Sequence, residues 1–163
     1  MATRVLRPTR MALLVGGVLI TSAIALQLFA SSAGAVGPVD ASSYRLPAED
    51  RARLIGMTFG EPPTEALPAT TAERLAAEQY DPVALGATSV DTFLETASEP
   101  GTFGTDVPVR DRAVWIVRLT GMSQEQPGPM TAEGVPAPSH FLHRAYIFID
   151  AKTGELLFTD WQE

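Results

Sequence analysis

His140 and His143 are the only histidines in the chain, and they are the first residues to consider for chemistry. Imidazole nitrogens bind zinc, and imidazole also serves as a general base. However, residues three apart on a strand point to opposite faces, and neither a cysteine nor a third ligand at a metal-binding spacing accompanies the pair. We therefore expect two ordinary histidines at the entrance of a strand. A metal-dependent hydrolase that uses them is the least favoured alternative.

Ser139, His140 and Asp150 supply the residue types of a serine-hydrolase triad. No nucleophile-elbow motif and no Gly-rich oxyanion loop lies near Ser139, so we expect no catalytic residues. Asp150 and Gly154 instead bound a five-residue segment between two strand-like runs. The Asp150 carboxylate can accept hydrogen bonds from the backbone amides that follow, and Gly154 can adopt the positive φ of a type I turn with a bulge. Both residues are predicted to be structural.

Four segments have the alternation or the β-branched and aromatic content of strands. They cover residues 90–95, 113–119, 145–149 and 156–161. Trp115 heads the aromatic residues on them, which could fill a core or form a binding platform, and half-buried alternation favours the core. The others are Tyr146, Phe148, Phe158 and Trp161. Both faces of the 113–119 strand are apolar, so either helices cover both sides or a partner covers one.

Two short helices are predicted before these strands. The first runs for three turns from Pro47, which suits a first helical turn, to Phe59, where Gly60 stops it. The second opens with a capping box at Thr70–Glu73 and runs to about Gln79. The predicted fold class is therefore α+β, with short helices packed on a small antiparallel sheet of about four strands.

Residues 121–139 are rich in Pro and Gly and are predicted to form an exposed loop between two paired strands. Most hairpin connections have two to five residues, so a loop of this length is either functional or a tolerated insertion. Its prolines restrict the backbone, and Met122, Met130 and Val135 offer apolar contacts. These three residues are the candidate partner-binding residues.

The N-terminus carries an export signal. Arg4, Arg7 and Arg10 precede residues 11–30, which contain no charged residue. This uncharged stretch of twenty residues spans about 30 Å as a helix, the thickness of a bilayer core, so it could remain as a single-pass anchor. The small residues Ala33 and Ala35 equally allow cleavage near Ala35 and secretion. In both cases the remainder of the chain is expected to be extracytoplasmic.

We therefore divide the chain into a signal peptide or signal anchor at 1–35, a linker at 36–45 and one domain at 46–163. The chain has no cysteine, so packing alone must stabilise this domain outside the cell. Three of the 12 basic residues of the whole chain lie in the export segment, so the rest of the chain has nine basic and 19 acidic residues. Nucleic acid is therefore an unfavourable partner, because phosphates attract clustered Lys and Arg.

The segment Trp115-Ile-Val-Arg-Leu-Thr-Gly, followed by Tyr146-Ile-Phe-Ile-Asp-Ala-Lys-Thr-Gly-Glu-Leu, resembles the end of a PepSY domain. PepSY domains are small extracytoplasmic modules found in propeptides of thermolysin-like metallopeptidases and in bacterial membrane or secreted proteins. The resemblance covers residues 113–161. It implies a helix packed on an antiparallel sheet, inhibitory or regulatory activity toward peptidases, and no catalytic residues.

These observations predict a non-catalytic, extracytoplasmic interaction module that needs no cofactor. It is expected to bind or restrain a peptidase or another cell-envelope protein, and to contact the membrane through residues 11–30 if that segment is retained. A small ligand-binding module of the cell envelope is the alternative. The residues identify neither the partner nor the oligomeric state.

Overall fold

The computed structural model describes residues 34–99, 101, 109–130, 134 and 136–163. The predicted export segment therefore lies outside the described residues up to residue 33, and so does Val135. No helix in the described part of the chain is both long and apolar enough to cross a membrane.

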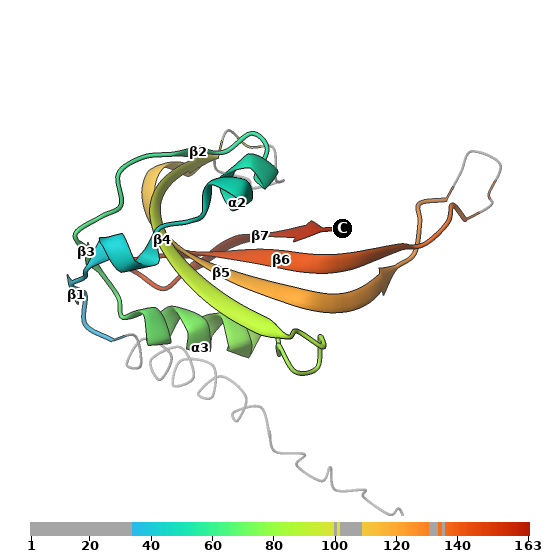
Figure 1. The fold of residues 1–163 in the computed structure, drawn as a ribbon, viewed down its shortest axis with the longest axis horizontal. Coiled ribbons are helices and arrows are strands. Elements are labelled where there is room, and N and C mark those ends of the chain that lie inside the picture. The colour runs from blue at the N-terminus through green and yellow to red at the C-terminus, as the bar shows by residue number, and fades with distance from the viewer. Residues whose placement is uncertain (1–33, 100, 102–108, 131–133, 135) are drawn as a thin grey trace, which may run out of the picture. The chain divides into compact units, whose positions relative to one another are not determined.

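The described residues form an α+β fold, which confirms the predicted class (Figure 1). The main sheet is antiparallel and has five strands in the order β2-β4-β5-β6-β7, where about four were predicted. A second sheet pairs only β1 with β3. The elements are β1 (Gly37–Pro38), the 3-10 helix η1 (Ala41–Tyr44), α2 (Ala48–Arg53), β2 (Thr58–Phe59), β3 (Glu65–Ala66), α3 (Ala69–Gln79), β4 (Ser89–Glu99), β5 (Val109–Gln126), β6 (His140–Asp150) and β7 (Leu156–Gln162).

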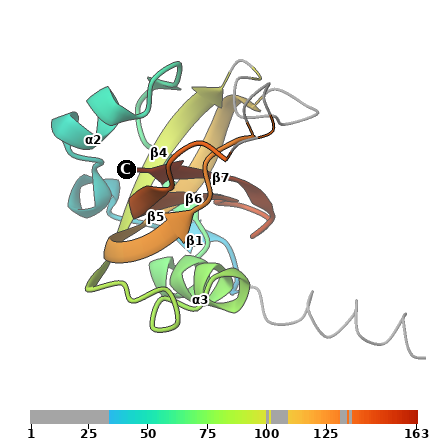
Figure 2. The ribbon, with the colours of Figure 1, turned by 90° about the vertical axis from the view of Figure 1, so that its right-hand side faces the viewer.

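One face of the main sheet packs against α3, which lies on the opposite side of the sheet from α2 (Figures 1 and 2). Trp115 is fully buried on this face, and its indole N–H donates to the backbone oxygen of Leu67 at 2.9 Å. Ala72 and Ala76 present small side chains to the sheet from α3. Small side chains let the helix backbone approach the sheet closely, so α3 excludes water from Trp115, Val117 and Leu119.

The other face forms a second core with residues that precede and end α2. Leu46 and Leu54 pack there with Ile116 and Phe148, and the ring of Phe148 stacks on Phe158 with centroids 4.2 Å apart. Elements of the same chain thus cover both apolar faces of β5, the first of the two arrangements that the sequence left open. The predicted core role of the aromatic residues is also confirmed, because four of the five are buried. The fifth, Trp161, is half-buried.

The predicted first helix is wrong in length. α2 ends at Arg53 after six residues, and the segment that follows turns at Gly56, with φ 89°, into strand β2. Ile55, which the predicted helix would have included, is 82% exposed. β2 pairs Phe59 with Ala97 of β4 and packs its ring against the second core. These long-range contacts outweigh the local helix signal.

The predicted capping box is also wrong, although the helix it was meant to open is present. α3 begins at Ala69 after Pro68, with no side-chain cap, and ends at Gln79 as predicted. Thr71 lies inside the helix and is buried. Glu73 accepts a hydrogen bond from Thr92 on β4 at 2.9 Å instead of capping the helix. Proline fixes φ near its helical value and lacks an N–H, so its position beside the first turn serves this start.

Residues 36–45, predicted to be a linker, contain β1 and η1. The ring of Tyr44 packs edge-on against Trp115, with centroids 5.2 Å apart. The folded unit therefore begins before residue 46.

The predicted loop at 121–139 is shorter than expected, because β5 continues to Gln126 and β6 starts at His140. β4 begins opposite Thr120, and β7 ends opposite Arg144. Residues 121–126 and 140–143 therefore form a two-stranded extension beyond the sheet, which we call the β5–β6 arm (Figure 1). Met122 lies at the base of this arm, is only 1% exposed and belongs to the first core, the one between the sheet and α3. Its prediction as a partner-binding residue is therefore wrong.

Candidate functional site

Asp150 organises the turn between β6 and β7. Its Oδ1 accepts hydrogen bonds from the backbone N–H groups of Lys152 and Thr153, both at 2.8 Å, and its Oδ2 lies 3.0 Å from Nε of Arg112. Gly154 has φ 76° and donates its N–H to the Asp150 backbone oxygen. This is the geometry that the turn prediction requires of both residues. As a result, the turn fixes the backbone of Lys152 beside β5.

A β-bulge shapes the neighbouring start of β5. The register with β4 shifts between Ala97 and Glu99, where β5 contains one extra residue. Asp111 has φ 44° there, a conformation that aspartate tolerates better than most residues. Its N–H donates to Ser98 Oγ at 2.8 Å, and the Ser98 hydroxyl donates back to Asp111 Oδ1 at 3.1 Å. Bulges re-aim side chains, and this one lies between Arg110 and Arg112.

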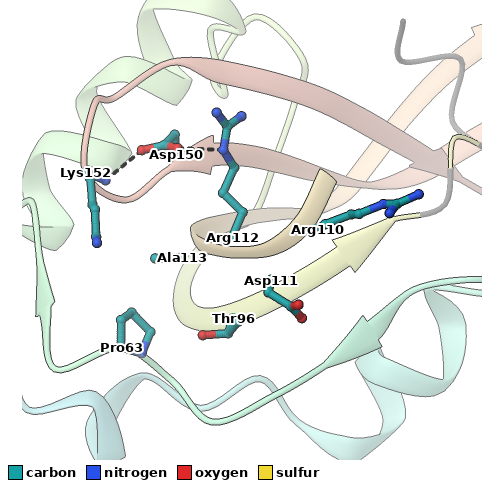
Figure 3. Close-up of a pocket in the computed structure, with 8 residues that line it drawn as sticks. All are labelled: Pro63, Thr96, Arg110, Asp111, Arg112, Ala113, Asp150 and Lys152. Atoms are coloured by element: carbon teal, nitrogen blue, oxygen red, sulfur yellow. Dashed lines mark hydrogen bonds and ion pairs between the residues drawn. The ribbon is translucent and has the colours of Figure 1, made fainter. Parts of the chain in front are cut away.

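The turn and the bulge together border an open pocket of about 370 Å³, which we call the basic pocket (Figure 3). Arg110, Arg112 and Lys152 supply its positive charge, and the side chains of Arg110 and Lys152 extend to opposite sides of it. Lys152 is the only lysine in the chain. The remaining lining residues are Pro63, Thr96, Asp111, Ala113 and Asp150.

A buried polar network elsewhere on the sheet fastens α2 in place. The carboxylate of Asp50, which is 1% exposed, accepts a hydrogen bond from the Tyr146 hydroxyl at 2.5 Å and pairs with Arg118. Arg118 also lies 2.9 Å from Asp91. Glu95 is fully buried and accepts from the Leu46 N–H at 2.8 Å and from Arg51 at 2.6 Å.

The charges in this network favour a structural role. Burial raises the pKa of Tyr146 above the usual tyrosine value, and its hydrogen bond to Asp50 raises it further, so the hydroxyl stays protonated. Burial by itself would lower the pKa of Arg118, but its hydrogen bond to Asp91 and the charge of Asp50 raise it overall. A neutral phenol and paired ions stabilise α2 on the sheet and supply neither a base nor a nucleophile at neutral pH.

The structure does not bring the triad residue types together. His140 starts β6 and Asp150 ends it, so ten residues of extended strand, roughly 33 Å, separate them. His140 Nδ1 lies 3.3 Å from the carboxylate of Glu163, and His143 Nδ1 lies 2.9 Å from the backbone oxygen of Met122. Within the described ranges, no group of three or more His, Asp or Glu side chains is placed to hold a metal ion.

The β5–β6 arm exposes apolar side chains. Met130, in the loop at its tip, is 66% exposed, and Phe141, on its second strand, is 48% exposed. A groove of about 320 Å³ lies along the arm, where Gln124 donates to the Leu85 backbone oxygen at 3.2 Å. Of the three predicted contact residues, Met130 alone is on the described surface.

Sequence reasoning did not identify the basic pocket or Phe141. The pocket assembles residues from the segment after β2, the bulge and the β6–β7 turn, which are far apart in the chain. The only local signal was Arg110-Asp-Arg112 directly before an apolar strand. Phe141 lies between the predicted loop at 121–139 and the predicted strand at 145–149, in a segment with no strong strand pattern.

Comparison of the chain with protein-family models, curated proteins and solved structures finds no match. The sequence resemblance and the geometry above are therefore the basis for proposals about function.

Proposed function

We propose that this chain is a non-catalytic, extracytoplasmic interaction module of the PepSY kind, which binds or restrains a peptidase or another cell-envelope protein. The observation that carries the proposal is the β5–β6 arm, which extends past the neighbouring strands and exposes Phe141, together with the loop at its tip, which exposes Met130. Contiguous exposed apolar patches mark protein-interaction sites, and we propose that these two side chains contribute to such a patch.

The arm has two properties that suit contact with another protein. Its strands run beyond Ser89 of β4 and Gln162 of β7, so its outer backbone edges are not paired with those strands. Free strand edges can pair with an extended segment of a partner, and adjacent apolar side chains then select it. The proline-rich loop between Gln126 and His140 also limits the conformational entropy that the tip would lose on binding.

Site-specific photo-crosslinking in intact cells tests the proposal. A photoreactive amino acid at Met130 or Phe141 should give a covalent adduct with an envelope protein. The same amino acid at Glu78, exposed on α3 and outside the arm, is the matched control and should give none. Equal adducts at all three positions, or an adduct at Glu78 alone, would contradict an arm-mediated interaction.

The peptidase version of the proposal has its own test. The purified chain should inhibit a thermolysin-like metallopeptidase from the same envelope in a concentration-dependent way. A variant with Met130→Ser and Phe141→Ser should inhibit less, because both substitutions remove exposed apolar contact area without touching either core. Inhibition that is unchanged in this variant would exclude the arm as the contact.

A small ligand-binding module is the second candidate function. The basic pocket favours it, because ligand sites are usually concave and this pocket is lined by charged and polar side chains.

A further inference from the structure

We infer that the basic pocket is a binding site for a peptide carboxylate, either an Asp or Glu side chain or a C-terminal carboxylate. The inference concerns a different surface from the β5–β6 arm and does not depend on the function proposed for it.

Charge is unevenly distributed over the folded part of the chain. Acidic residues outnumber basic ones 19 to nine after the export segment, and most basic side chains elsewhere in the fold have an acid beside them. Around the basic pocket the balance reverses, with three cations and two acids. Neither the Arg110 guanidinium nor the Lys152 ammonium has an acceptor among the described residues. An anion bound in the pocket would compensate the excess positive charge of its lining.

Asp150 cannot supply this anion. It is only 5% exposed, and both of its oxygens are engaged, by two backbone N–H groups and by Nε of Arg112. This contact uses one edge of the Arg112 guanidinium. Its terminal nitrogens keep donors for a ligand, in the planar arrangement that matches a carboxylate. Asp150 therefore holds Arg112 and the Lys152 backbone in position and leaves the ligand contacts to them.

The lining of the pocket indicates the type of anion. Pro63 and Ala113 add apolar wall beside the charges, which suits the carbon chain of a peptide. A volume of about 370 Å³ lies at the lower end of the roughly 300 to 1,000 Å³ of ligand pockets, enough for a few residues of peptide.

The test is an NMR titration of the isotope-labelled full chain in a neutral detergent. Acetyl-Ala-Glu-Ala-amide carries a side-chain carboxylate, and acetyl-Ala-Gln-Ala with a free terminus carries a C-terminal one. Acetyl-Ala-Gln-Ala-amide is the neutral control, and inorganic phosphate is the competing anion. At least one carboxylate peptide should shift the backbone amides of Ala113 and Lys152, with a Kd on the order of 1 mM that weakens as salt rises. Which of the two binds more tightly identifies the source of the carboxylate.

Matched variants locate the site. Arg110→Gln and Lys152→Gln should each weaken binding by roughly threefold to tenfold, because each removes a charged donor at an exposed site. Arg53→Gln makes the same charge change on α2, outside the pocket, and should leave the Kd unchanged. Unchanged amide dispersion in all three variants verifies the fold. Equal shifts from the neutral peptide, tighter binding of phosphate, or equal binding by all variants would each overturn the inference.

Discussion

Substitution of Gly154 by valine should destabilise the domain, because the β6–β7 turn requires a conformation that valine avoids. Gly154 has φ 76°, and a left-handed backbone costs an L-residue about 1 to 2 kcal/mol. A Cβ at this position would also lie 3.0 Å from Cδ1 of Leu75 on α3. That contact is with the end of a flexible side chain, so it adds little. Valine also stiffens the unfolded chain, which offsets part of the cost.

The expected net loss for Gly154→Val is therefore about 1 to 2 kcal/mol, which lowers the urea midpoint by roughly 0.5 to 1 M. Tryptophan fluorescence of residues 36–163 during urea unfolding measures it, since Trp115 is buried and Trp161 half-buried.

Two controls separate the causes of this loss. Gly154→Asn should cost less than Gly154→Val, because asparagine tolerates positive φ better. Gly86→Val places valine at φ 71° with nothing within 4 Å of its Cβ, so it reports the backbone cost without the Leu75 contact. A Gly154→Val domain as stable as the wild type would refute the assigned turn conformation.

Three further predictions concern the core, the pH dependence and the topology. Trp115→Ala should cost about 3 to 5 kcal/mol in the same urea assay, because it empties a fully buried site and leaves the Leu67 oxygen without its donor. Burial raises the pKa of Asp160, so its contribution to stability is present at acid pH and is lost as the pH rises through the folded-state value. Asp160→Asn should therefore raise the urea midpoint at pH 7 and flatten its pH dependence, whereas an unchanged pH profile would count against this assignment. A reporter enzyme active only outside the cytoplasm should be active when fused after Glu163, and stable but inactive fusion protein would contradict export.

Local chemistry explains why the sequence predicted the C-terminal hairpin better than the other elements. Asp150 and Gly154 each have a specific task in the turn, and the flanking runs are strongly β-branched and aromatic. The first helix was predicted too long because the 47–59 segment has helical signals. In the structure, Phe59 pairs with Ala97 of β4 and so belongs to strand β2. Ala97 is far along the chain, so the sequence around Phe59 does not show this pairing.

The arm shows a different limit of sequence reasoning. Pro and Gly content marked all of 121–139 as loop, yet Met122 belongs to the first core and Gln126 to β5. The register shift after Thr120 lets β5 continue with two extra residues past Gly121, which has φ 75°. A glycine at this position fits a loop as well as a bulge, and only the pairing with β6 distinguishes the two. The basic pocket was missed for the same reason, since its cations become neighbours only through the bulge at Asp111 and the turn at Asp150.

Capture of a partner from cell-envelope extract tests most directly whether this chain is an interaction module that acts through its arm. Three forms of the full chain serve as bait: the wild type, a form with residues 127–139 replaced by a short Gly-Ser link, and a form with His140→Ala and His143→Ala. Shortening a surface loop costs little free energy, so all three forms should melt within a few degrees of one another. The proposed function predicts that the wild type and the histidine variant capture the same protein and that the loop replacement loses it. Undiminished capture by the loop replacement, or loss of capture in the histidine variant alone, would contradict it.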